Sequence, residues 1–234
     1  MPKSRMILAI DTCGSSGSIA LGLMDGEDIY ILGDSQLGGR SYSERLIAAI
    51  GEMLGLGGVH LGLVSAIVAV NGPGSFTGVR VGLSAVKGLA EGSRIPVVAV
   101  SRLEVFAAAA KVSSVALDAH RHEVFLRVAE PAGTAQELLA GAAELAAIEP
   151  PPPRVAVCDE EAARLLQEAW PTVELVRTTA PTAAHALRLC APRVARGEFV
   201  DLALLDGHYL RRSDAEIFGA DVVAQAARTE AKGA

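Results

Sequence analysis

Residues 71–78, Asn-Gly-Pro-Gly-Ser-Phe-Thr-Gly, form the segment of this chain whose composition best suits ligand binding. The segment follows a short apolar run at 63–70 and precedes an amphipathic pattern at 79–92, so it should connect a buried strand to a helix. Its backbone N–H groups, beside the positive end of the helix dipole, would suit a phosphate. A tight connection that binds nothing explains the same residues, because Pro73 fixes φ and the glycines allow positive φ.

Alternating strand and helix patterns surround this turn in the first half of the chain. Apolar runs bounded by small polar residues predict strands, and apolar residues at helical spacing predict helices. The expected elements are strands at 6–10, 18–24 and 29–32, a helix at 43–54, a strand at 63–70, a helix at 79–92 and a strand at 96–100. This order is that of a ribonuclease-H-like half-domain, as in the actin, Hsp70 and sugar-kinase group.

In that group, the turn after the first strand handles phosphate and metal. The resemblance therefore implies that Asp11, Thr12 and Ser15 face a bound nucleotide. The alternative is that Asp11 ends a strand and hydrogen-bonds its own turn. The two turns together supply the candidate phosphate-binding residues, a site that is either vestigial or regulatory: Asp11, Thr12, Ser15, Gly72, Gly74, Ser75, Thr77 and Gly78.

The composition predicts a cytoplasmic protein with no membrane contact. No apolar run approaches the roughly 18 uncharged residues of a membrane span, and the N-terminus lacks the features of a signal peptide. The three cysteines are widely spaced with no CxxC, as expected of small buried hydrophobes in a reducing compartment. The net charge of −6 argues against unaided binding of nucleic acid.

The predicted helix at 79–92 contains glycines at a cost of about 1 kcal/mol each relative to alanine, which suggests close approach of another backbone. That backbone could belong to the chain's own sheet or to a partner, and the helix at 43–54 favours a partner because it is apolar on more than one side. On the second hypothesis, Gly82→Leu would weaken association and leave the monomer folded. The candidate interface residues are Leu46, Ile47, Ile50, Met53, Val79, Gly82, Leu83 and Val86.

Four blocks of sequence closely resemble the TsaB (YeaZ) family. They are Leu-Ala-Ile-Asp-Thr at 8–12, the glycine turn continued by Val-Arg-Val-Gly at 71–82, Leu-Asp-Ala-His-Arg-His-Glu-Val-Phe at 117–125, and Tyr-Leu-Arg with Ala-Glu at 209–216. The resemblance implies an α/β fold of two ribonuclease-H-like (actin/Hsp70-type) subdomains, with mixed sheets flanked by helices. The expected division is an N-terminal subdomain at 1–105, a degenerate C-terminal subdomain at 106–223 and a disordered tail at 224–234.

The same resemblance implies a partner protein in the synthesis of tRNA threonylcarbamoyladenosine at position 37. The chain would form a heterodimer with TsaD, which catalyses the transfer of threonylcarbamoyl to adenosine, and help recruit the ATPase TsaE. The two candidate interface helices would then pack on their counterparts in TsaD, and would form a homodimer in its absence. The tRNA is expected to bind only through the complex. No cofactor is expected to be required, although weak nucleotide binding at the turns stays open.

Residues after the predicted strand at 96–100 indicate that this chain is not the catalyst. TsaD binds its metal there through a His-x-x-x-His pair, and an ungapped placement puts Arg102 and Phe106 at those positions. A guanidinium is always protonated and a phenyl ring has no lone pair, so neither can ligate a metal. We therefore predict no catalytic residue and no metal ligand.

Two alternatives stay open. An actin-fold ATPase or kinase would need an adenosine-binding Gly-Gly or Gly-x-Gly in the second half, and none occurs after residue 110. A protease acting on TsaD would need a nucleophile beside a base, and no such motif is recognisable. Tyr42 departs from the His that the family commonly carries, and His120 and His122 from its usual Arg-x-Gly. The two histidines could project from one side of a strand, but a metal site needs further ligands.

Overall fold

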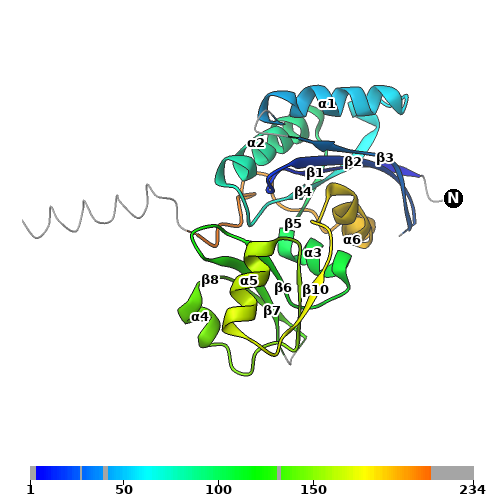
Figure 1. Cartoon of the computed structure of the whole chain (residues 1–234). Coiled ribbons are helices and arrows are strands. Elements are labelled where there is room, and N and C mark those ends of the chain that lie inside the picture. Colours follow the sequence, from blue (N-terminus) through cyan, green and yellow to red (C-terminus); the bar gives the residue numbers. More distant parts are fainter. Residues whose placement is uncertain (1–3, 27, 39–41, 131–132, 212–234) are drawn as a thin grey trace, which may run out of the picture.

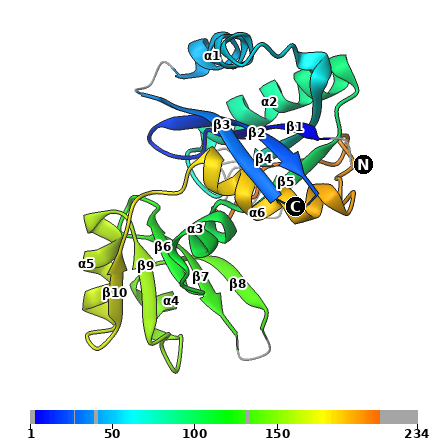
Figure 2. The same cartoon turned by 90° about the vertical axis from the view of Figure 1, so that its right-hand side faces the viewer.

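The computed structural model describes residues 4–26, 28–38, 42–130 and 133–211, which form two subdomains, one above the other in Figures 1 and 2. Each subdomain contains one five-stranded mixed sheet flanked by helices. The predicted α/β fold class is therefore confirmed. The tail at 224–234 and the side chain of Tyr42 lie outside the described residues.

The sheet of the first subdomain has the order β3-β2-β1-β4-β5. Its central strand β1 pairs antiparallel with β2 and parallel with β4. The carboxyl ends of β1 and β4 consequently meet at one edge, which brings together the turns that follow them. The strands are β1 (Arg5–Asp11), β2 (Gly17–Asp25), β3 (Asp28–Leu37), β4 (Val64–Val70) and β5 (Val97–Val100).

The sheet of the second subdomain has the order β10-β9-β6-β7-β8. Its central strand β6 again pairs antiparallel with the next strand and parallel with β9. The two sheets therefore share one topology, as expected of two ribonuclease-H-like subdomains. The strands are β6 (Val115–Asp118), β7 (Val124–Ala129), β8 (Ala135–Ala140), β9 (Arg154–Val157) and β10 (Glu174–Arg177).

Helices cover both sheets. In Figure 1, α1 (Tyr42–Leu56) and α2 (Phe76–Ser93) lie on one face of the first sheet and α6 (Ala183–Ala195) lies on the other. α3 (Arg102–Ala110) packs between α6 and the second sheet. α4 (Ala142–Ala146) packs on α5 (Glu160–Ala169), which contacts β6 and β9, and a 3₁₀ turn (Leu61–Leu63) precedes β4. No helix in the described ranges is long and apolar enough to cross a bilayer.

The subdomain boundary differs from the predicted division at 106–223. Leu187 and Cys190 of α6 are buried in the core of the first subdomain, although the sequence pattern assigned this helix to the second. The apolar stripe of a helix shows that it packs, but not on which of two sheets. The chain crosses to the second subdomain at 100–102 and returns at 178–182.

Beyond residue 100, the sequence pattern does not indicate three elements of the structure, namely α3, α4 and β8. β8 carries polar residues and is only half-buried, so it lacks the apolar alternation of an internal strand. α2 also begins at Phe76, three residues before its expected start. Ser75 caps it, because its hydroxyl accepts a hydrogen bond from the Gly78 N–H at 3.3 Å.

Candidate functional site

A cleft of about 1190 Å³ lies between the two subdomains. Its walls come from the turn after β1, the turn before α2, the start of α3, the β6–β7 turn and residues 208–211. The cleft is therefore the place where both subdomains and both halves of the chain meet. Its charged and titratable residues include Arg80, Arg102, Arg121, Arg211, Asp118, Asp159, His120 and His208.

The turns after β1 and β4 are joined into one wall by hydrogen bonds. The Ser75 N–H donates to the Cys13 carbonyl at 2.8 Å, and the Thr12 hydroxyl donates to the Gly78 carbonyl at 2.7 Å. The Asp11 carboxylate accepts from the Cys13 N–H at 2.9 Å, which closes its own turn. These contacts match the alternative in which Asp11 ends a strand and braces the turn.

The structure brings the eight candidate phosphate-binding residues together, but only half of them reach the cleft. Those that line it are Ser15, Gly74, Ser75 and Thr77. The others are buried within the wall, namely Asp11, Thr12, Gly72 and Gly78. Binding of a phosphate at the four exposed residues stays a prediction.

Close packing of this wall requires two of its glycines. A Cβ at Gly74 would lie 2.1 Å from the Cys13 carbonyl oxygen, and a Cβ at Gly82 would lie 2.2 Å from the Thr12 hydroxyl oxygen. The close neighbour of Gly82 is therefore the chain's own first turn. This geometry argues against the expectation that Gly82→Leu would leave the monomer folded, because the larger side chain would collide with Thr12 in the core.

Arg102 and Phe106 both make contacts within the chain. The Arg102 Nε lies 3.5 Å from an Asp11 carboxylate oxygen, so a fixed guanidinium supplies the positive charge beside this aspartate. Phe106 is fully buried in the core between α3 and the second sheet. Neither side chain offers a lone pair to the cleft.

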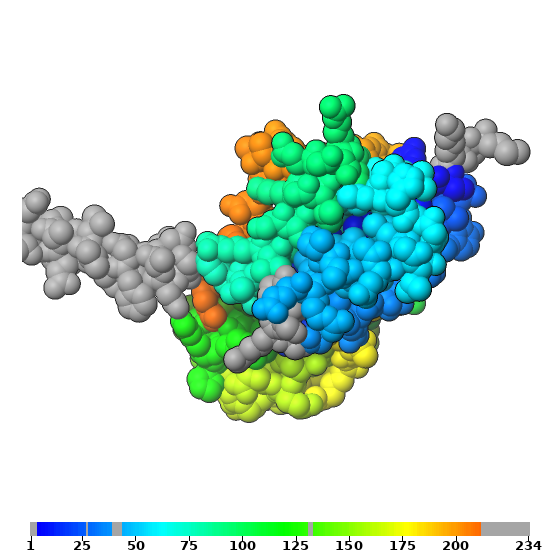
Figure 3. Space-filling view, turned by 90° about the horizontal axis from the view of Figure 1, so that it is seen from above, coloured from blue at the N-terminus to red at the C-terminus, as the bar shows by residue number. Residues whose placement is uncertain are grey.

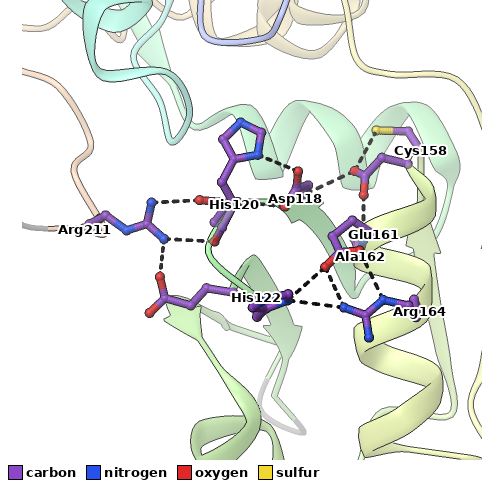
Figure 4. Close-up of polar contacts among 11 residues, drawn as sticks. Asp118, His120, His122, Cys158, Glu161, Ala162, Arg164 and Arg211 are labelled. Atoms are coloured by element: carbon purple, nitrogen blue, oxygen red, sulfur yellow. Dashed lines mark hydrogen bonds and ion pairs between the residues drawn. The ribbon is translucent and has the colours of Figure 1, made fainter.

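The β6–β7 turn forms the opposite wall of the cleft. His120, Arg121 and His122 have φ values of 59°, 58° and 60°, so they form a left-handed turn rather than a strand. His120 Nδ1 lies 2.8 Å from Asp118, whereas His122 Nδ1 lies 3.3 Å from Glu161 on α5 (Figure 4). The possibility that both histidines project from one side of a strand is therefore excluded, because residues 120–122 form a turn.

A glycine at position 122 should stabilise the fold. A left-handed conformation costs an L-residue about 1 kcal/mol, and the exposed contact between His122 and Glu161 offsets little of this. We expect His122→Gly to raise the free energy of unfolding by about 1 kcal/mol in urea titrations. His60→Gly is the control, because His60 has a φ of −106° and should gain nothing. A His122→Gly protein no more stable than wild type would contradict the expectation.

Two cysteines line the cleft, and both are protonated at neutral pH. Burial, reinforced by Asp11, raises the pKa of Cys13 well above its usual range. Burial, reinforced by Asp159, raises the pKa of Cys158 to about 11. Since the thiolate is the nucleophilic form, this weighs against a protease that uses either cysteine.

Residues 205–211, here called the strap, complete the cleft and contact Glu137 of β8. His208 Nε2 lies 2.9 Å from Glu137 Oε2, which also accepts from the Ser101 hydroxyl at 2.6 Å. Arg127 donates to Oε1 at 2.8 Å. Burial by itself would raise the pKa of Glu137, but the hydrogen bonds from these three side chains outweigh it and lower the pKa.

Glu137 should make stability depend on acid pH. Because its pKa is lowered in the folded state, its contribution is complete above the unfolded pKa and is lost as the pH falls through the folded pKa. We expect Glu137→Gln to lower the free energy of unfolding by about 2 kcal/mol at pH 7. The difference from wild type should shrink below about pH 4, measured by urea titration across pH. A difference that is constant from pH 7 to pH 3 would contradict this.

Seven of the eight predicted interface residues are buried within the chain itself. The seven are Leu46, Ile50, Met53, Val79, Gly82, Leu83 and Val86, and they pack between the helices and the first sheet. Ile47 is 55% exposed. The outward face of α1 also presents Ala48, Gly51, Gly55 and Leu56. A partner would therefore meet α1 through Ile47 and these small neighbours, with the seven buried residues supporting the surface from below.

The comparisons with known proteins agree with this architecture. A family described as TsaD, tRNA N6-adenosine threonylcarbamoyltransferase, matches residues 35–152, about half of the chain. Among curated relatives, the tRNA threonylcarbamoyladenosine biosynthesis protein TsaB of Haemophilus influenzae is 39% identical over 53% of this chain and 53% of its own length. The Escherichia coli TsaB is 36% identical over 43% of this chain and 42% of its own length. The chain belongs to this family, in its TsaB (YeaZ) branch. It spans about half the length of the curated relatives it matches.

Solved structures extend the TsaB likeness over most of the chain. YeaZ from Pseudomonas aeruginosa is 27% identical, with a TM-score of 0.71 over 88% of this chain and 100% of that one. Component A of (R)-2-hydroxyglutaryl-CoA dehydratase from Acidaminococcus fermentans has a TM-score of 0.50 at 14% identity, over 82% of this chain and 100% of that one. The second likeness, at this low identity, concerns the fold alone.

The cleft contains residues to which sequence reasoning gave no role. His208 is far in the sequence from the other histidines, and Asp159 belongs to none of the four blocks that resemble the family. The Tyr-Leu-Arg block at 209–211 did carry a signal through its family resemblance, but no role could be read from it. His208 and residues 209–211 reach the cleft through the return of the chain after α6, whereas Asp159 reaches it at the start of α5.

Proposed function

We propose that this chain is a non-catalytic partner in the synthesis of tRNA N6-threonylcarbamoyladenosine, which binds TsaD and helps to recruit TsaE. The names of its TsaB relatives support the pathway. The observation that supports the partner role is at α3, where an ungapped placement of the sequence puts Arg102 and Phe106 at the positions of the metal-binding histidines of TsaD. Arg102 is paired with Asp11 and Phe106 is in the core, so the metal chemistry would come from the other chain.

The outward face of α1, with the neighbouring face of α2, is the proposed surface for TsaD. These two helices lie side by side on the face seen in Figure 3. Small residues on α1 would let another helix approach closely, and Ile47 and Leu56 would supply apolar area. The same surface would form a homodimer when TsaD is absent. The complex would act in the cytoplasm, and the tRNA would bind through it, because this chain carries a net charge of −6.

No cofactor is required for this role, and weak nucleotide binding at the exposed half of the two turns is kept as the alternative. The test is size-exclusion chromatography with light scattering, on the chain alone and mixed with TsaD from the same organism. We expect a homodimer to be replaced by a 1:1 heterodimer. Failure to associate, with and without ATP, would reject the partner role and direct attention to nucleotide binding and hydrolysis by the isolated chain.

A further inference from the structure

The strap at residues 205–211 continues the chain from the first subdomain and is held to the second by non-covalent contacts. Leu205 is buried in the core of the first subdomain. The His208 N–H donates to the Asn71 carbonyl at 2.7 Å, and the Asn71 side chain donates to the Asp206 carbonyl at 3.2 Å. These contacts fix the first part of the strap to the end of β4.

The second part of the strap is fixed to the other subdomain. The His208 side chain contacts Glu137 of β8, as described above. The Arg211 guanidinium donates to the Ala119 carbonyl at 2.7 Å and pairs with Glu123, both at the β6–β7 turn (Figure 4). Leu210 packs against the core between α3 and the second sheet. A segment of seven residues thus bridges the two walls of the cleft.

The covalent links leave freedom for the subdomains to move. Among the described residues, the helices and strands of the two subdomains are joined at 100–102 and 178–182, both of which are short connections between regular elements. Hinge motions in proteins are absorbed by a few such residues at the ends of elements. The strap adds a third, non-covalent link, and its side chains line the cleft that such a motion would open.

We propose that the strap is a latch that holds the two subdomains closed over the cleft, and that its release opens the cleft. The backbone of the strap packs closely on the turn before α2, since a Cβ at Gly72 would lie 2.8 Å from the His208 carbonyl oxygen. The ring of Tyr209 also lies 5.2 Å from that of Phe76, at the start of α2. A ligand or partner that needs the cleft open must therefore displace these contacts. This inference does not depend on the proposed role with TsaD.

Native cysteines provide the test. Cys158 lines the cleft and is partly exposed, whereas Cys190, on α6, is fully buried in the core of the first subdomain and reports general unfolding. Labelling with N-ethylmaleimide, resolved by mass spectrometry, would be compared in wild type, His208→Ala and His208→Ala/Arg211→Ala. Arg164→Ala is the control, because it breaks ion pairs on the outside of α5.

We expect labelling of Cys158 to accelerate in the single variant and by about tenfold in the double variant, with Cys190 unchanged. The Arg164→Ala protein should behave as wild type. Unchanged labelling of Cys158 in both strap variants would overturn the latch. An equal rise at Cys158 and Cys190 in both would also overturn it, because the strap would then stabilise the whole fold rather than the closed cleft.

Discussion

Gly82→Ala is expected to lower the free energy of unfolding by about 2–3 kcal/mol, whereas Gly88→Ala in the same helix should raise it by up to about 1 kcal/mol. The Cβ added at position 82 would lie 2.2 Å from the Thr12 hydroxyl oxygen. That hydroxyl cannot rotate away freely, because it donates to the Gly78 carbonyl at 2.7 Å and is buried. A Cβ at position 88 meets nothing within 4 Å, so only the better helix propensity of alanine remains.

Urea titrations of both single variants measure this pair of opposite effects. A third protein isolates the cause, because Thr12→Ala removes the oxygen that the new Cβ would meet. Gly82→Ala should therefore cost less on the Thr12→Ala background than on wild type, a coupling that a double-mutant cycle reports. Equal costs on the two backgrounds would show that Gly82 is required for some reason other than Thr12.

The contrast between Gly82 and Gly88 also shows where sequence reasoning stops. Both glycines lie in a helix and carry the same propensity cost, so the sequence indicates close packing for both. Only the fold decides that one faces Thr12 while the other faces solvent. Whether Gly82 packs on its own chain or on a partner depends on the position of Thr12, in a turn that lies 70 residues earlier in the sequence.

Most of the fold could be predicted, because the apolar periodicity of each segment indicates whether it forms a strand or a helix. The strands of the first sheet and the helices α1, α2, α5 and α6 have clear apolar periodicity. β8 could not be predicted, since it is a polar, half-buried strand, and the placement of α6 depends on long-range contacts. For the site, glycine-rich turns marked one wall of the cleft. The other wall and the strap could not be predicted, because their residues, such as Asp159 and His208, are distant in the sequence and line one cleft only in the folded chain.

Ile47→Asp should weaken association with TsaD by about 2 kcal/mol or more, which is about a thirtyfold rise in Kd. Ile47 is 55% exposed on α1, so the folded monomer tolerates the charge, but an apolar contact with a partner helix would leave the carboxylate buried and unpaired. Titration calorimetry with TsaD measures the change, and circular dichroism checks the fold. Leu204→Asp is the matched control, because Leu204 is an apolar residue that is 79% exposed on the loop after α6 rather than on α1 or α2.

The two variants distinguish binding through a specific surface on α1 from non-specific association through any exposed apolar residue. If TsaD binds through α1, the Leu204→Asp protein should retain wild-type affinity while Ile47→Asp loses it. Loss of the homodimer in the same Ile47→Asp protein would mean that one surface serves both assemblies, so that TsaD must compete with a second copy of this chain. Unchanged affinity of Ile47→Asp for TsaD would instead place the partner surface away from α1, since the other predicted apolar residues of these helices are already buried against their own sheet.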